Sequence, residues 1–151
     1  MKTLTTVLLL ALVAMTSGCV SSQTGTVMPG ANIAAISKYY VVRLPADTRG
    51  VNKLIADDLV ARGFEATTGE AVNVPSDAQA VVTYQDKWVW DITMYMLKLD
   101  VQFRNPKNDM PLASGTAMHT SFVRKSPPEM TKEVLDQIFS KVPTASPVGG
   151  K

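Results

Sequence analysis

The stretch Ala80–Arg104, AVVTYQDKWVWDITMYMLKLDVQFR, decides the fold of this chain. It holds both tryptophans and alternates apolar with polar residues, which is the period of a β-strand. The apolar positions are even from Trp88 to Met96 and odd from Leu97 to Phe103. Because side chains alternate strictly along a strand, this change predicts either a β-bulge near Met96 or a first half that is covered on both faces.

The composition is that of one small domain with short appendages. The chain has 151 residues, of which 46% are hydrophobic and 19% are charged. Fifteen Lys and Arg residues against 13 Asp and Glu residues leave a net charge of only +2. A nucleic-acid-binding protein would need a basic patch or stripe, so we expect no nucleic-acid partner.

The N-terminus has the layout of a secretory signal peptide. Lys2 precedes an apolar run at 7–14, and the small residues Ser17 and Gly18 precede Cys19. The run is too short to cross a bilayer, which takes about 20 apolar residues. Cys19 is also the only cysteine, which excludes an internal disulfide and a multi-cysteine metal site.

Residues 1–21 resemble the precursor of a bacterial lipoprotein. Ser17, Gly18 and Cys19 match the last three positions of the lipidation motif, with Thr16 where leucine is usual. The resemblance implies that signal peptide 1–18 is removed and that Cys19 carries acyl chains such as palmitate. The alternative is an ordinary secreted protein in which Cys19 is removed or remains a lone thiol.

The same resemblance implies a location. Val20 and Ser21 follow the cysteine, and no aspartate stands at the second mature position, which implies the outer membrane over the inner one. The chain is then expected to be anchored by lipid, with its domain in the periplasm and no transmembrane helix. A partner among envelope proteins is expected as well, and its identity and the oligomeric state stay open.

Three segments are expected after the signal peptide. Residues 19–36 are small and polar and contain Pro29-Gly30, which predicts a lipidated flexible tether. Residues 37–142 form the single folded domain. Residues 143–151 have no apolar pattern and are expected to be a disordered tail.

The domain is expected to be α+β: a mixed, mainly antiparallel sheet of about five strands, with two amphipathic helices packed on one face as a two-layer sandwich. Gln85-Asp86-Lys87 is the expected turn into the long strand, and a single bent strand is the alternative. The expected elements are a strand over 38–44, a helix over 49–62 capped by Asp47 or Thr48, strands over 64–67, 79–84, 88–104 and 112–122, and a helix that starts at the capping box Ser126–Glu129 and ends at Pro143.

This architecture is similar to the small α/β sandwiches of envelope lipoproteins that assist outer-membrane or cell-wall machinery. The segment Tyr84–Asp91 also resembles small bacterial lipoproteins of unassigned role. A fold does not determine a function, so the function depends on the chemistry of particular residues.

The sequence offers little for catalysis. His119 is the only histidine, and no nucleophile elbow accompanies it, so we expect a structural histidine. Asp86, Asp91 and Asp100 lie close in sequence, but Asp91 has a different parity from the other two. Nothing pairs two carboxylates for glycoside hydrolysis, and we expect no enzyme and no cofactor.

The aromatic and methionine residues of the long strand form the candidate binding face. Trp88, Trp90, Met94 and Met96 share one parity, and could either bind a partner or ligand or pack as core. Thioether and imidazole groups are soft ligands for Cu(I), so a weak alternative joins Met94 and Met96 to Met118 and His119. Packing is preferred, since methionine is an ordinary core filler.

The expected function is therefore a protein-interaction or structural role in the envelope. The first alternative is a ligand-binding or Cu(I)-binding lipoprotein that uses the Trp/Met face. A hydrolase acting on envelope material is the least favoured.

Overall fold

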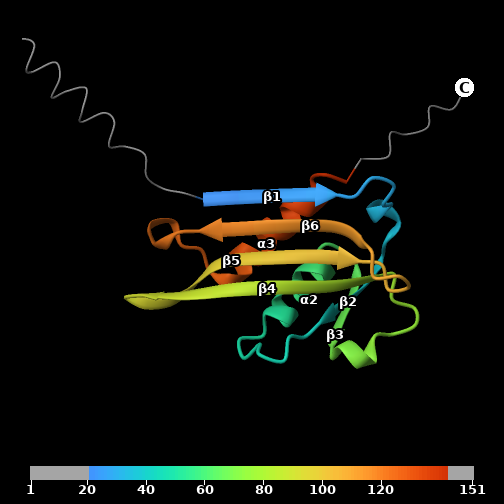
Figure 1. Cartoon of the computed structure of the whole chain (residues 1–151), viewed down its shortest axis with the longest axis horizontal. Coiled ribbons are helices and arrows are strands. Elements are labelled where there is room, and N and C mark those ends of the chain that lie inside the picture. The colour runs from blue at the N-terminus through green and yellow to red at the C-terminus, as the bar shows by residue number, and fades with distance from the viewer. Residues whose placement is uncertain (1–20, 143–151) are drawn as a thin grey trace, which may run out of the picture.

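The computed structural model describes residues 21–142, which form one open mixed sheet with two helices behind it (Figure 1). The expected α+β class is confirmed, although the sheet has six strands where about five were expected. The elements are β1 (Ser21–Val27), η1 (Ile33–Ala35), β2 (Lys38–Val42), α2 (Val51–Ala61), β3 (Glu65–Gly69), η2 (Ala71–Asn73), β4 (Ala80–Asp91), β5 (Thr93–Arg104), β6 (Pro111–His119), η3 (Ser121–Val123) and α3 (Pro127–Phe139).

The strand order is β1-β6-β5-β4-β2-β3. Strands β1, β6, β5 and β4 pair antiparallel, while β2 is parallel to both β3 and β4. Helix α2 connects the parallel neighbours β2 and β3, as the crossover in a strand–helix–strand unit does. Since both helices lie behind the sheet in Figure 1, its other face, which we call the open face, carries no helix.

The change of parity is caused by a β-bulge. Lys87 is opposite Lys98, whereas Trp88 is opposite Met96, so Leu97 is an extra residue on β5. The extra residue shifts the alternation by one and keeps Met96 and the odd positions beyond it on the same, helix-covered face. Of the two alternatives that the sequence leaves open, the bulge near Met96 is the one that the structure contains.

The turn into β5 lies elsewhere than expected. Strand β4 continues through 85–87 to Asp91, and the chain reverses at Ile92, whose φ is 61°. Trp90 and Met94 are opposite each other across this turn, so their side chains lie on the same face of the sheet. Both residues also have even numbers. The apolar residues therefore stay at even positions on both sides of the turn, and the sequence pattern does not reveal that the chain reverses there. A β-branched residue in the left-handed region also gives no turn signal.

The prediction that residues 19–36 form a flexible tether is wrong for most of the residues in this range that the structure describes. Residues 21–27 form edge strand β1, which pairs with β6 along its whole length, and Ile33 is 2% exposed. The strand is made of small polar residues, so it lacks the apolar alternation that identifies strands. Its pairing with β6 and the contact of Gly25 with α3 fix it instead. The signal peptide, Cys19 and the tail 143–151 lie outside the described residues.

Glycine lets α3 approach the edge of the sheet. Gly25 and Gly115 are cross-strand partners, and a Cβ added at Gly25 would lie 2.1 Å from the carbonyl oxygen of Gln137. A Cβ at Gly115 would lie 2.8 Å from the Val134 carbonyl oxygen. The helix backbone thus packs directly on these two glycines, as happens where a backbone needs close approach.

Helix α2 is held at its start by a buried carboxylate. The helix begins at Val51 with Gly50 as its N-cap, so the prediction that Asp47 or Thr48 is the N-cap is wrong. The side chain of Asp47 instead accepts hydrogen bonds from the amides of Arg49 and Gly50, both at 2.8 Å, in the turn that precedes the helix. Asp47 also accepts one from the Tyr84 hydroxyl at 2.6 Å, which ties the helix start to β4. Burial would raise the pKa of Asp47, but the hydrogen bonds from Tyr84 and the amides outweigh it and hold that pKa below its usual value.

Helix α3 starts as its sequence predicts. Ser126 and Glu129 form the capping box, with Pro127 at the first helical position. The apolar side of the helix packs on the sheet, and the stacked rings of Phe64 and Phe139 lie 5.2 Å apart between centroids. The buried residues of the helix are Met130, Thr131, Val134, Leu135 and Ile138.

Candidate functional site

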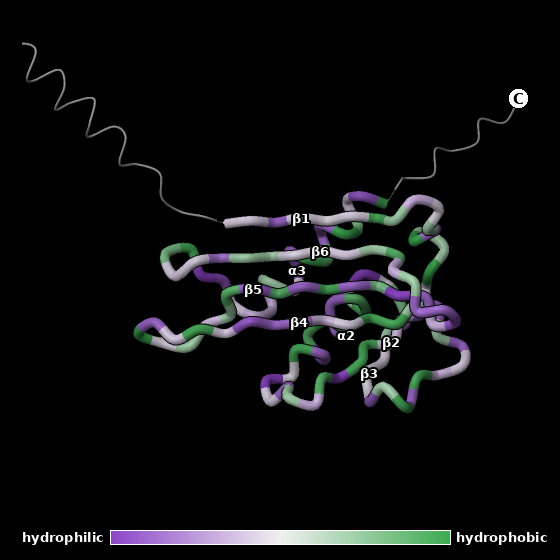
Figure 2. Tube along the Cα trace, in the orientation of Figure 1, coloured by the Kyte–Doolittle hydropathy of each residue, from purple (hydrophilic) through white to green (hydrophobic). Residues whose placement is uncertain are grey.

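Four exposed apolar side chains of the domain lie at one end of the sheet. Trp90 is 72% exposed, Ile92 85%, Met94 47% and Phe122 91%, and together they are four of the seven large hydrophobic residues exposed within residues 21–142. We call these four residues the apolar end. Figure 2 shows hydrophobic segments at the β4–β5 turn and at η3, on the same side of the molecule. Such clustering is typical of a contact surface.

One arginine holds the two parts of the apolar end together. Arg124 donates from Nη1 to the Thr93 hydroxyl at 2.7 Å and from Nη2 to the Asp91 carbonyl at 2.8 Å. Its Nε donates to the Ser121 carbonyl at 2.9 Å, and its guanidinium lies 4.5 Å from the centroid of the Tyr95 ring. The β4–β5 turn and the Phe122 turn are therefore fixed relative to each other.

The candidate binding face predicted from the sequence is divided by the structure. Trp88 is half-buried against the core, with the Arg49 guanidinium 4.3 Å from its ring centroid, and Met96 is fully buried. Trp90 and Met94 continue the same face beyond the helices and are exposed. Two of the four residues are thus core and two are surface.

The possible copper ligands are not brought together. Met96 lies on the helix-covered face, whereas Met118 pairs with Lys98 on the open face. His119 is buried, and its Nε2 lies 2.6 Å from the carboxylate of Glu133 on α3. No group of three or more His, Cys, Asp and Glu side chains within residues 21–142 could hold a metal ion.

His119 belongs to a small polar cluster under α3. Glu133 accepts hydrogen bonds from Lys125 and, at 2.9 Å, from Gln23 of β1. Burial alone would raise the pKa of Glu133, but Lys125 and His119 outweigh it and lower that pKa. The cluster links β1, β6 and α3, which is a structural role.

The three aspartates are separated by the fold. Asp86 accepts a hydrogen bond from the Trp88 indole, and Asp91 lies at the turn beside Arg124. Asp100 lies on the open face, where it accepts a hydrogen bond from Thr116 at 2.6 Å and pairs with Lys98 at 2.8 Å. Each carboxylate has its own partners.

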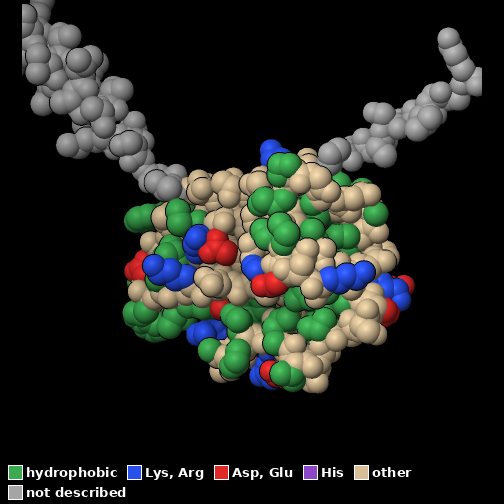
Figure 3. Space-filling model, turned by 45° about the vertical axis from the view of Figure 1, so that its right-hand side comes forward, with side chains coloured by type: hydrophobic (Ala, Val, Ile, Leu, Met, Phe, Trp, Pro, Cys, Tyr) green, Lys and Arg blue, Asp and Glu red, His purple; other side chains and the backbone are tan. Residues whose placement is uncertain are grey.

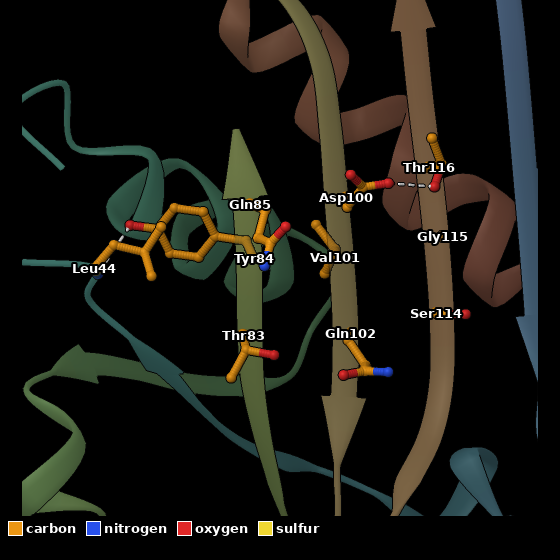
Figure 4. A pocket seen from close by; sticks show the side chains of 10 residues that line it. All are labelled: Leu44, Thr83, Tyr84, Gln85, Asp100, Val101, Gln102, Ser114, Gly115 and Thr116. Atoms are coloured by element: carbon orange, nitrogen blue, oxygen red, sulfur yellow. Dashed lines mark hydrogen bonds between the residues drawn. The ribbon is translucent and has the colours of Figure 1, made fainter. Parts of the chain in front are cut away.

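The open face is the second surface of interest. It carries a shallow hollow of about 450 Å³ over β4, β5 and β6. Figure 4 shows uncharged side chains around Asp100, on strands that lie side by side. Figure 3 shows charges of both signs scattered between polar and hydrophobic side chains. The lining residues are Leu44, Thr83, Tyr84, Gln85, Asp100, Val101, Gln102, Ser114, Gly115 and Thr116.

Phe122 and Arg124 are the residues that sequence reasoning misses. Phe122 stands at the end of an expected strand, where one more apolar residue attracts no notice. Its exposure appears only once β6 ends at His119 and the chain turns through η3. The role of Arg124 depends on a contact with a turn more than 30 residues earlier in the chain, at Asp91.

The part of the chain described here contains no helix long and apolar enough to span a membrane. No protein-family model matches the chain, and no curated protein matches it.

Several solved structures share the fold. The chain resembles the PelC dodecamer from Paraburkholderia phytofirmans, with a TM-score of 0.62 and 15% identity over 79% of this chain and 98% of that chain. A PDZ domain protein from Parabacteroides distasonis matches with a TM-score of 0.51 and 10% identity over 91% of this chain and 40% of that chain. For a minor lipoprotein from Acinetobacter baumannii the TM-score is only 0.36, with 15% identity over 71% of this chain and 91% of that chain, which is too low to show a shared fold. At such identities the similarities show the fold alone.

Proposed function

We propose that this chain is a non-enzymatic lipoprotein, anchored to the outer membrane through Cys19, whose domain has a protein-interaction or structural role in the bacterial envelope. The signal-peptide layout and the position of Cys19 support the anchor. The separation of His119, Asp100 and the methionines onto different faces supports a role in contact over one in catalysis or copper binding.

The observation that carries the interaction role is the open face. A sheet with helices on one side leaves its other side to solvent unless a partner covers it. Here that side carries a hollow lined by neutral polar side chains on three adjacent strands, with the Asp100 carboxylate already paired to Lys98. Such a surface can form hydrogen bonds with a protein partner without burying an uncompensated charge.

The fold similarity suggests the first partner to test. The PelC chain with which this chain shares its fold is described as a dodecamer. Two further features suit assembly: β1 and β3 are both edge strands, and an exposed edge is a template for pairing. A second copy of this chain is therefore the first partner to test.

Site-specific photo-crosslinking in cells tests the interaction role. A crosslinker at Gln85, which is exposed on the open face, should give one defined adduct, with a second copy or with one envelope protein. The control places the same group at Asp57, which is exposed on α2. Equal, diffuse labelling from both positions would contradict the role proposed for the open face.

Replacing Cys19 by alanine should release the protein from the membrane fraction. Several acyl chains at about 0.8 kcal/mol per buried CH₂ hold a protein firmly, and the substitution removes the thiol to which they would be attached. Fractionation followed by immunoblotting measures the release, and metabolic labelling with a palmitate analogue should fail for the variant. Cys19→Ala protein that stays in the membrane fraction and still takes up label would contradict the anchor.

A further inference from the structure

We propose that the apolar end, formed by Trp90, Ile92, Met94 and Phe122, rests in the lipid surface to which Cys19 is anchored, and that it holds the domain upright on the membrane. This inference rests on the proposed lipid anchor and adds a second contact with the same bilayer. Its chemistry is that of a phospholipid interface: an acyl region for the apolar side chains and phosphate groups above it.

The start of β1 places the anchor at the right end of the domain. Ser21 pairs with His119, the last residue of β6, and Phe122 follows only three residues later. Figure 1 shows the start of β1, the η3 turn and the β4–β5 turn all on the left-hand side. Only Val20 separates Cys19 from Ser21, so their Cα atoms lie within about 7 Å of each other. A lipid on Cys19 would therefore bring this end, and not the opposite one, to the bilayer.

The shape of the apolar end suits a fluid better than a rigid partner. Pairing between β5 and β6 stops at Lys98 and Met118, while β4 and β5 continue as a two-stranded ribbon to Ile92. The exposed side chains thus sit on a narrow projection. A protein partner would need a matching pocket for it, whereas lipid chains rearrange around an inserted side chain. Tryptophan is also the side chain enriched at membrane interfaces.

The base of the ribbon carries charge that suits phosphate groups. Lys87 and Lys98 lie directly opposite each other on the open face, at the last pair before the bulge. Like charges in this position repel, and Asp100, at 2.8 Å from Lys98, balances one of the two. An anionic headgroup beside Lys87 would balance the other. Lysines next to an anionic membrane surface are attracted to it.

Because the apolar end has a fixed geometry, its insertion would set the orientation of the domain relative to the membrane. Arg124 joins the β4–β5 turn to the Phe122 turn through bonds to Thr93, Asp91 and Ser121. The β4–β5 turn and the Phe122 turn then provide two separate membrane contacts, which together fix the tilt of the domain. The strands then run away from the membrane, and the Asn105–Met110 turn at the other end of β5 and β6 points into the compartment.

Lipid quenching of single tryptophans tests the inference, because the chain supplies its own control. The Trp88→Phe variant leaves Trp90, and the Trp90→Phe variant leaves Trp88, which is packed against the core. Each full-length lipidated protein is reconstituted in phosphatidylethanolamine–phosphatidylglycerol vesicles, with or without bromine on the acyl chains. Because interfacial side chains reach about 5–10 Å into the bilayer, we expect Trp90 emission to fall about twofold or more, and Trp88 emission to change little.

Flotation of the same vesicles separates failure of the anchor from failure of this inference. Protein that floats while Trp90 is not quenched would refute the membrane contact and leave the anchor intact. Protein that does not float would refute both. Trp90 emission that changes with protein concentration, and not with brominated lipid, would assign the apolar end to a second copy and overturn the proposal.

Discussion

Replacing Gly25 by alanine is expected to lower the free energy of unfolding by about 3 kcal/mol, near the top of the range for overpacking. The added Cβ would lie 2.1 Å from the carbonyl oxygen of Gln137 and 2.4 Å from its carbonyl carbon. These are main-chain atoms of α3, so no side chain can swing away to relieve the contact. Either α3 shifts off the sheet or β1 detaches from β6.

Chemical denaturation with matched variants measures this loss. Thr24→Ala is the control, since Thr24 is the exposed neighbour on β1 and should change stability by about 0.5 kcal/mol or less. If β1 detaches first, the amides of β6 that face it should lose protection from hydrogen exchange before the rest of the sheet. A Gly25→Ala protein as stable as its control would mean that residues 21–27 are a tether after all.

Replacing Asp47 by alanine should cost about 3–4 kcal/mol, because one buried carboxylate binds both the amides at the start of α2 and the Tyr84 hydroxyl. The side chain accepts bonds from the Arg49 and Gly50 amides at 2.8 Å and from the Tyr84 hydroxyl at 2.6 Å. Removal of the Asp47 carboxylate leaves the buried Tyr84 hydroxyl without its hydrogen-bond acceptor. Tyr84→Phe should cost about 1.5–3 kcal/mol, the usual value for a hydrogen bond to a charged group.

Thr48→Ala is the control for the Asp47 variant. The sequence leaves Asp47 and Thr48 as alternative caps, and Thr48 is exposed in the structure. Thermal and urea unfolding should therefore place Thr48→Ala within about 0.5 kcal/mol of the natural chain. A larger loss for Thr48→Ala than for Asp47→Ala would show that Asp47 is not the residue that holds the start of α2.

The contribution of Asp47 should also depend on pH in a defined direction. Its pKa in the folded chain lies below the ordinary value, so the ionised form stabilises the fold. That stability is complete above about pH 4 and is lost as the pH falls through the folded pKa, because the carboxyl is then protonated in both states. Unfolding of the natural chain and of Asp47→Asn from pH 7 to pH 2 should show a stability difference that shrinks only in the acid range. A difference independent of pH would contradict this assignment.

Local signals in the sequence predict much of the fold. The change of parity limits the cause to a bulge near Leu97 or to a strand half covered on both faces, and the start of α3 follows from Ser126, Pro127 and Glu129. The apolar spacing of α2 predicts a helix near its observed place, from Val51 to Ala61. In each case the residues that give the signal are neighbours in sequence, so the physical cause is local.

The candidate site is predicted only in part. Parity places Trp88, Trp90, Met94 and Met96 on one face, and the structure agrees. Which of them are exposed depends on where the helices end beneath the sheet, and parity contains no information about that. Phe122 joins the surface through the path of the chain after β6, and Arg124 through bonds that cross more than 30 residues.

The sequence by itself determined the α+β class, the change of parity near Met96, the capping box of α3 and the single cysteine for which an anchor is proposed, because each is a matter of local pattern. Only the tertiary structure decided that Ser21–Val27 is a strand and that the chain reverses at Ile92. A polar edge strand has no apolar alternation of its own and forms through pairing with its neighbour. A turn that does not change the parity of the apolar positions cannot be recognised from the sequence pattern. The tertiary structure likewise placed Trp90 and Phe122 at the end where the chain from Cys19 enters the fold.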